Sequence, residues 1–307
     1  MKIVLNLLVF CLVLFVYLHV YFHFKVCNDL EIYEIDEPSK DRLEDICDLR
    51  QPVMFQYMNE NMLKICNRNT IQKTYGAFEV KLRNLTDVIG SDDEMYIPFS
   101  FTNALDVIKE DVDKKYLVEK NEEFLEETAM NKIFKYNDAF VRPPMVSNCM
   151  YDILCGGDGV RTPFRYDLNY RNYYMVTEGE VRIKLAPPKS SKYLYQHNDY
   201  ENFEFCSNVN PWDVQPQYRN DFAKIKCLEV IVKKGYMIHI PAFWWYSIEF
   251  GKETTVATFK YRTYMNNVAI LPKLCMQMLQ TQNIKRRIAT INHGVYHEES
   301  YNNNEIE

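Results

Sequence analysis

The hydrophobic pattern begins with an unbroken apolar run at the N-terminus. Residues 3–24 contain no Asp, Glu, Lys or Arg. As a helix they would extend about 33 Å, which is enough to cross a hydrocarbon core of roughly 30 Å. The run is longer than the apolar core of a signal peptide, and no small-residue cleavage site follows it. We therefore predict an uncleaved transmembrane anchor over residues 1–25, with a cleaved signal peptide as the alternative.

The charges that flank this run do not fix its orientation. Lys2 precedes it and Lys25 follows it, so the bias that keeps basic residues in the cytosol is balanced. Because nearly the whole chain follows the anchor, we expect a single-pass membrane protein with a short cytosolic N-terminal tail. Its C-terminal domain is then lumenal or external.

Two polar segments border the part of the chain that can fold. Residues 26–50 are acidic and contain Pro38, and we predict a stalk with a short helix near Arg42–Cys47. Residues 286–307 are polar and are predicted to form a disordered tail. The folded domain is therefore expected to span residues 51–285.

Short segments with period-two alternation predominate within this domain. In Val181–Leu185 apolar and polar residues alternate, and Asn172–Thr177 precedes it across the turn Glu178-Gly179, which predicts a hairpin. The other predicted strands are Pro52–Tyr57, Ala77–Leu82, Tyr193–Tyr195, Cys227–Val232, Met237–Ile240, Trp245–Phe250 and Val256–Tyr261. Many short strands separated by turns indicate a mainly β fold, either an antiparallel barrel or a double-sheet jelly roll.

Helical spacing of apolar residues marks two segments that flank the strands. One is Thr102–Lys135, where apolar residues recur at intervals of three and four. The other begins at Pro272, with Leu274, Cys275, Met278 and Leu279 as apolar positions. This last helix offers a surface for oligomerisation.

Composition narrows the function only slightly. The chain has 307 residues, 47% hydrophobic and 25% charged, with a formal net charge of −6. An acidic chain argues against nucleic-acid binding, which needs a basic face. Of the nine cysteines, Cys11 lies in the anchor, and the other eight permit disulfides without defining their pairing. Because no Cys-x-x-Cys occurs, we expect no zinc site.

Two segments in the strand-rich region carry a family resemblance. Thr162-Pro-Phe-Arg-Tyr-Asp167 and Ile240-Pro-Ala-Phe-Trp-Trp-Tyr246 resemble the two metal-bearing segments of JmjC-type, cupin-like iron/2-oxoglutarate oxygenases, including the factor-inhibiting-HIF-like type. The resemblance implies a double-stranded β-helix, a jelly roll of the cupin type. The segments Asn210-Pro-Trp212 and Phe243-Trp-Trp-Tyr-Ser247 resemble in sequence the cupin-like proteins of large DNA viruses and algae.

The resemblance also implies where iron would bind. The family holds iron with a His-x-Asp/Glu pair on one strand and a His on a later strand. Here Arg165 and Tyr246 stand at the two His positions, and only Asp167 remains. A guanidinium has no free lone pair, and a protonated phenol binds ferrous iron poorly. The basic residue that would hold 2-oxoglutarate falls on Val181, so we expect neither iron nor 2-oxoglutarate as a cofactor.

These substitutions lead to a hypothesis about function. We expect an Arg165–Asp167 pair beneath Tyr246, lining the interior of a catalytically inactive domain that serves as a binding or structural module. Further candidate pocket residues are Thr162, Tyr174, Arg182, His239 and Trp245. The ligand would be a small anion, a glycan or a protein, and residues 3–24 would contact the membrane. The alternative is a non-standard oxygenase, or a metal-free cupin enzyme that uses Asp167 and Tyr246.

Overall fold

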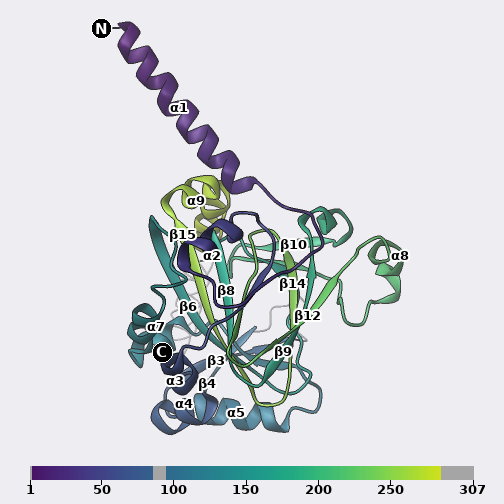
Figure 1. The fold of residues 1–307 in the computed structure, drawn as a ribbon. Helices are drawn as coiled ribbons and strands as arrows, with labels where there is room; N and C mark the ends of the chain where they lie inside the picture. The colour runs from purple at the N-terminus through teal and green to yellow at the C-terminus, as the bar shows by residue number, and fades with distance from the viewer. Residues whose placement is uncertain (1, 86–94, 285–307) are drawn as a thin grey trace, which may run out of the picture.

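The described part of the chain, residues 2–85 and 95–284 of a computed structural model, is mainly β and contains two sheets (Figure 1). The nine-stranded sheet has the order β1 (Tyr33–Ile35), β2 (Val53–Gln56), β13 (Tyr236–His239), β8 (Arg171–Glu178), β15 (Thr254–Thr263), β6 (Val146–Gly156), β5 (Tyr116–Val118), β3 (Glu79–Asn84), β4 (Tyr96–Ser100). The six-stranded sheet has the order β10 (Gln196–Asp199), β11 (Glu204–Ser207), β7 (Phe164–Tyr166), β14 (Trp245–Phe250), β9 (Glu180–Ala186), β12 (Leu228–Lys233).

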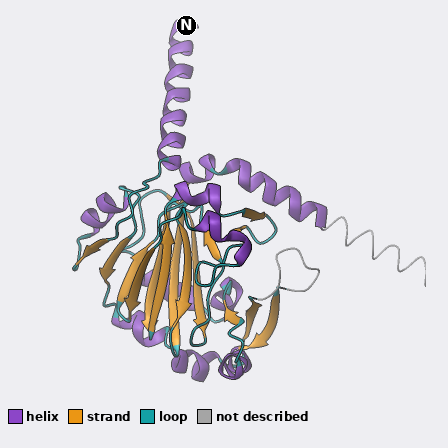
Figure 2. Ribbon diagram, turned by 90° about the vertical axis from the view of Figure 1, so that its right-hand side faces the viewer, coloured by secondary structure: helices purple, strands orange, loops and turns teal. Residues whose placement is uncertain are grey.

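Helices lie around the outside of this β sandwich, and the first of them projects away from it, as Figure 2 shows. They are α1 (Lys2–Phe24), α2 (Lys40–Cys47), α3 (Glu60–Ile65), α4 (Arg68–Tyr75), α5 (Phe101–Glu110), α6 (Glu122–Glu127), α7 (Met130–Asn137), α8 (Arg219–Phe222) and α9 (Tyr264–Ala269). Short 3-10 helices occupy Pro188–Tyr193 and Pro216–Tyr218, and residues 271–284 are helical. The predicted mainly β, cupin-type fold with an N-terminal apolar helix is confirmed.

The core has two principal layers that follow the two faces of the nine-stranded sheet. Between the sheets, alternate residues of β9 (Val181, Ile183 and Leu185) pack with residues of β14 such as Ile248. On the other face, Phe259 of β15 packs in a second cluster with residues of the covering helices. Because both faces are covered, β8 is buried along nearly its whole length instead of alternating.

The predicted hairpin is present, and its turn requires glycine. Strands β8 and β9 meet at Gly179, which has φ of +70°. A Cβ atom there would lie 2.5 Å from Oγ1 of Thr254. Both the left-handed backbone and this close approach exclude a side chain.

Parts of the predicted secondary structure are wrong. Thr102–Lys135 is not continuously helical, because β5 separates α5 from α6 and pairs with β6 through Leu117 and Val118, which are buried. In place of the predicted strand Tyr193–Tyr195, Tyr193 ends a 3-10 helix and residues 194–195 form a turn. The eleven-residue strand β6 was not predicted, since its polar residues obscure the alternation.

Residues 26–50, predicted as a stalk, pack against the domain in the structure. Strand β1 pairs in parallel with β2, and α2 buries Leu43, Ile46 and Cys47 in the core. The predicted short helix near Arg42–Cys47 is present as part of α2. The predicted tail, residues 286–307, lies outside the described residues.

All nine cysteine thiols are unpaired.

Helix α1 projects from the domain and has the properties of a membrane span (Figure 1). Among the described residues it is the one helix long and apolar enough to cross a bilayer, and its apolar window is not buried against the domain. Only its last turns contact the domain: the ring centroid of Phe24 lies 6.1 Å from that of Phe243, and Arg50 lies 4.8 Å from the ring of Phe22. The span therefore ends directly on the folded domain.

Candidate functional site

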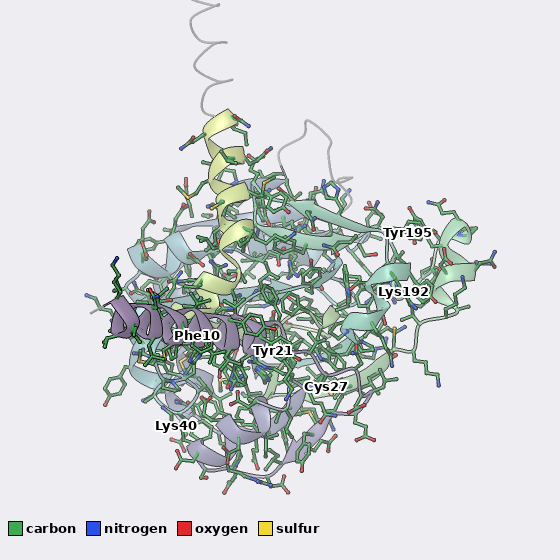
Figure 3. The ribbon with its side chains drawn as sticks, turned by 90° about the horizontal axis from the view of Figure 1, so that it is seen from above. Phe10, Tyr21, Cys27, Lys40, Lys192 and Tyr195 are labelled. Carbon is green, nitrogen blue, oxygen red and sulfur yellow. The ribbon has the colours of Figure 1, made fainter. Side chains whose placement is uncertain are left out.

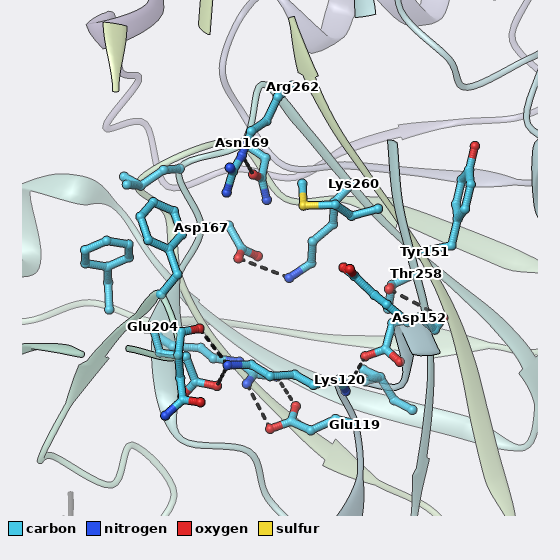
Figure 4. Close-up of a pocket in the computed structure, with 18 of the residues that line it drawn as sticks. Glu119, Lys120, Tyr151, Asp152, Asp167, Asn169, Glu204, Thr258, Lys260 and Arg262 are labelled. Atoms are coloured by element: carbon cyan, nitrogen blue, oxygen red, sulfur yellow. Dashed lines mark hydrogen bonds and ion pairs between the residues drawn. The ribbon is translucent and has the colours of Figure 1, made fainter. Parts of the chain in front are cut away.

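A cavity of about 480 Å³ opens at one end of the sandwich, between the two sheets (Figure 4). The nine-stranded sheet contributes Lys260 of β15, and the six-stranded sheet contributes Arg165 of β7. Helix α6 lies at its edge with Glu122 and Glu126. The other charged lining residues are Lys81, Glu119, Lys120, Glu123, Asp152, Asp167, Glu204 and Arg262.

The structure brings Arg165, Asp167 and Tyr246 together, as the sequence predicted. Strands β7 and β14 are antiparallel neighbours, with Arg165 directly opposite Tyr246, and Asp167 follows β7. The hydroxyls of Tyr174 and Tyr246 each lie 2.9 Å from Oδ2 of Asp167 and 2.7 Å from each other. Asp167 is thus held by two phenols that come from opposite sheets.

Lys260 completes this cluster and was missed by the sequence reasoning. Its ammonium donates to Oδ1 of Asp167 at 3.0 Å. Burial alone would raise the pKa of Asp167, but the Lys260 ammonium and the Arg165 guanidinium outweigh burial and hold that pKa below its usual value. A signal existed: Val256, Thr258 and Lys260 share one face of a predicted strand, and a lysine on an inward face needs a buried partner.

The predicted ion pair between Arg165 and Asp167 is not present, because each side chain has another partner. Both terminal nitrogens of Arg165 donate to Glu119, at 3.2 and 2.8 Å. Arg83 donates to the same Glu119 at 2.5 Å and binds both carboxylate oxygens of Glu204 at 3.0 Å. No sequence pattern points to Glu119 as this partner, because it lies far from Arg165 along the chain and the two meet only through the order of strands in the sheets.

The pKa values of two carboxylates at the cavity, Glu119 and Asp152, are shifted in opposite directions. Burial would raise the pKa of Glu119, yet the guanidinium groups of Arg165 and Arg83 lower it to about 2. Asp152 has no such partner: burial raises its pKa to about 6, against the backbone N–H groups of Asn121 and Lys120 that donate to it at 2.9 and 2.7 Å. Glu119 is therefore an ion well below neutral pH, whereas Asp152 takes up a proton at a higher pH than an ordinary aspartate.

Of the further candidate pocket residues, Tyr174 lines this cavity and the other four lie elsewhere. Thr162 accepts a hydrogen bond from the backbone of Ile248. Arg182 pairs with Glu249 at the surface. The remaining two are core residues: His239 is fully buried with its ring 5.0 Å from that of Tyr173, and Nε1 of Trp245 donates to Ser191 at 2.8 Å.

The residues at the cavity wall do not fit the iron that the resemblance implies. Asp167 is the one carboxylate at the three positions, and both its oxygens already accept hydrogen bonds. Burial and the neighbouring Asp167 raise the pKa of Tyr246 to about 12, so the phenol keeps its proton. Arg165 has no lone pair to donate. Ferrous iron in such sites needs two neutral imidazoles beside the carboxylate, and neither is here.

The network predicts that Glu119→Gln destabilises the protein by about 3–5 kcal/mol, because it leaves the buried Arg165 guanidinium without an acidic partner. Thermal or denaturant unfolding of the full chain in detergent measures this. The control is Glu126→Gln, which changes an exposed residue at the cavity edge and should stay within about 0.5 kcal/mol. Equal, small effects of the two substitutions would contradict a buried ion network.

Comparison with known families agrees with this architecture. A family model described as a cupin-like domain matches residues 44–266. The match begins in α2, ends in α9 and contains every strand from β2 to β15, including those that carry Arg165, Tyr246 and Lys260. Since it covers well over half of the 307 residues, the chain belongs to the family of cupin-like domain proteins.

Proposed function

We propose that this protein is a membrane-anchored cupin-like domain that binds a ligand in its cavity without iron or 2-oxoglutarate. The observation that carries the proposal is the closed cluster of Asp167, Lys260, Tyr174 and Tyr246, in which each polar group already has a partner from the protein itself. A lysine ammonium satisfies the carboxylate that would otherwise be available to a metal ion.

The same cluster argues against a metal-free enzyme that uses Asp167 and Tyr246. General acid–base catalysis at neutral pH is most efficient when the pKa of the group lies near that pH. Here burial and Asp167 raise the pKa of Tyr246 to about 12, and the pKa of Asp167 is lowered. The pKa values of the two groups are shifted away from neutral pH in opposite directions. Such shifts favour a structural hydrogen bond over proton transfer.

The charge balance of the cavity favours a neutral, hydroxyl-rich ligand, and we propose a saccharide. Seven acidic and five basic side chains line the cavity, so it offers no surplus of positive charge to a small anion. Arg165, Lys120 and Lys260 are paired with acids. The amides of Asn169 and Asn202 each have one partner in the protein at the nitrogen and keep a second N–H for a ligand. With the rings of Tyr166 and Phe203, they offer the hydrogen bonds and apolar faces that sugar rings use.

The metal part of the proposal has a direct test. The full chain purified in detergent should retain no stoichiometric iron and should not turn over 2-oxoglutarate. The variant Arg165→His, Tyr246→His, Lys260→Met should gain a divalent metal, because it restores two imidazoles and frees Asp167 from its ammonium partner. Cobalt(II) titration followed by absorption measures binding.

Two control variants make this test specific. Adding Asp167→Asn to the triple variant should abolish the acquired metal binding. The double variant that keeps Lys260 should bind cobalt more weakly, because the ammonium still competes for the carboxylate. Stoichiometric iron in the parent protein would contradict the proposal.

Ligand binding is tested with defined saccharides. Thermal unfolding of the full chain should shift upward with at least one member of a panel of mono- and oligosaccharides, since a ligand that binds only the native state stabilises it. Asn202→Trp, which fills part of the cavity, should remove the shift, whereas Asn103→Trp on α5 should keep it. A shift with 2-oxoglutarate or inorganic phosphate, and none with any sugar, would contradict the saccharide assignment.

Helix α1 provides the proposed anchor, and its attachment has its own test. The protein should stay in the membrane pellet after washing with high salt and with alkaline carbonate, because its attachment is hydrophobic rather than electrostatic. Release of the full-length chain by carbonate would contradict an anchor. A mature N-terminus near Lys25 would show that the segment is a cleaved signal peptide instead.

A further inference from the structure

A helical segment that includes α9 and residues 271–284 lies at the foot of α1. Helix α9 packs against α1, and residues 271–284 then run across the top of the domain, transverse to α1 (Figure 2). Seen from above, the two helices leave the same region of the domain in different directions (Figure 3). A membrane crossed by α1 would therefore meet the second helix along its length.

Residues 271–284 form a helix that exposes a row of apolar side chains on the side away from the domain. The side toward the domain carries Leu274, which packs against the core. It also carries Lys273, whose ammonium donates to the hydroxyl of Tyr200 at 3.1 Å, and Gln277, which lines the cavity. The side away from the domain carries Leu271, Met278 and Leu279, which are 53%, 63% and 56% exposed. Helices of soluble domains keep their polar residues on the side away from the core. The exposed apolar residues here therefore indicate contact with a further apolar surface.

Residues at the end of α1 indicate the level of the membrane surface. Tyr17 and Tyr21 lie in the last two turns of α1 and are exposed, as is Phe24. Tyrosine side chains concentrate where the hydrocarbon core meets the headgroups. On α9 itself, Tyr264 and Val268 are exposed beside them. The apolar stripe thus continues from the domain end of the proposed span.

We propose that the segment from α9 to residue 284 lies in the headgroup region of the bilayer that α1 crosses, with the stripe Leu271, Met278 and Leu279 inserted toward the acyl chains. The proposal rests on the membrane anchoring proposed above. Its partner is lipid rather than a second copy of the chain, because the helix lies transverse to α1 at the end of the domain where α1 enters. Two contacts, α1 and this helix, then fix the domain against the membrane instead of letting it swing.

The test uses the full chain in phosphatidylcholine liposomes, with a fluorescent amino acid at one position and spin-labelled phospholipids as quenchers. A probe at Met278 should lose much of its emission when the spin label sits near the headgroup end of the acyl chain. Helix α5 lies at the end of the domain away from α1 (Figure 1). A probe at Val112, which follows α5 and is 88% exposed, should lose none. Leu279→Gln should weaken the quenching at Met278, and the polar-face control Gln280→Asn should not.

A third probe position separates failure of docking from failure of anchoring. A probe at Phe10, in the middle of α1, should be quenched by a spin label deep in the acyl chain. Quenching at Phe10 without quenching at Met278 overturns the docking and leaves the anchor intact. Absence of quenching at both overturns both. A Met278 probe that responds to protein concentration and not to labelled lipid assigns the stripe to a second copy, which also overturns the proposal.

Discussion

The two sheets of this domain are joined at the cavity end by ion pairs, and the arrangement of the site depends on them. Arg83 of β3 binds Glu204 of β11, and Glu119, which follows β5, binds Arg165 of β7. In each pair one partner belongs to the nine-stranded sheet and the other to the six-stranded sheet. Elsewhere the sheets contact each other through apolar side chains. At the cavity end, ion pairs take the place of these hydrophobic contacts. Buried pairs give little net stability, but they fix geometry, and here they set the distance between the sheets around the cavity.

The cluster around Asp167 also joins the two sheets, through a further ion pair and hydrogen bonds. Lys260 of β15 and Tyr174 of β8 reach across from the nine-stranded sheet to Asp167 and Tyr246 on the six-stranded side. In a metalloenzyme of this architecture a metal ion would join the strands at this place. A cation and two phenols do so here, with hydrogen bonds in place of coordination. The charge of the carboxylate is thereby neutralised inside the protein by Lys260.

How far the sequence predicts this structure depends on the range of the interactions involved. Local alternation predicted β9, and the two motifs placed Arg165 beside Tyr246, because spacing along a strand and antiparallel pairing are readable from the chain. The partners of these residues were not readable. Glu119 lies 46 positions from Arg165 and Lys260 lies 93 from Asp167, so their meeting is decided by the order of strands in the sheets. Arg165 and Asp167 were therefore paired with each other on local grounds, although each binds a distant residue.

The segment 26–50 and the helix of residues 271–284 also show which features local sequence patterns do not predict. An acidic, proline-containing stretch after an anchor has the composition of a linker, yet Leu43 and Cys47 are buried and β1 extends the large sheet. The composition of such a segment reflects its exposed residues, which are the majority. It does not reveal the few residues that pack against the domain. For residues 271–284 the amphipathic spacing was visible, but not which face meets the domain. Because Gln277 lines the cavity on one face and the apolar stripe points outward on the other, a membrane contact on this helix would lie beside the cavity. This helix would then contribute, together with α1, to the position of the domain on the membrane, and it would also border the cavity.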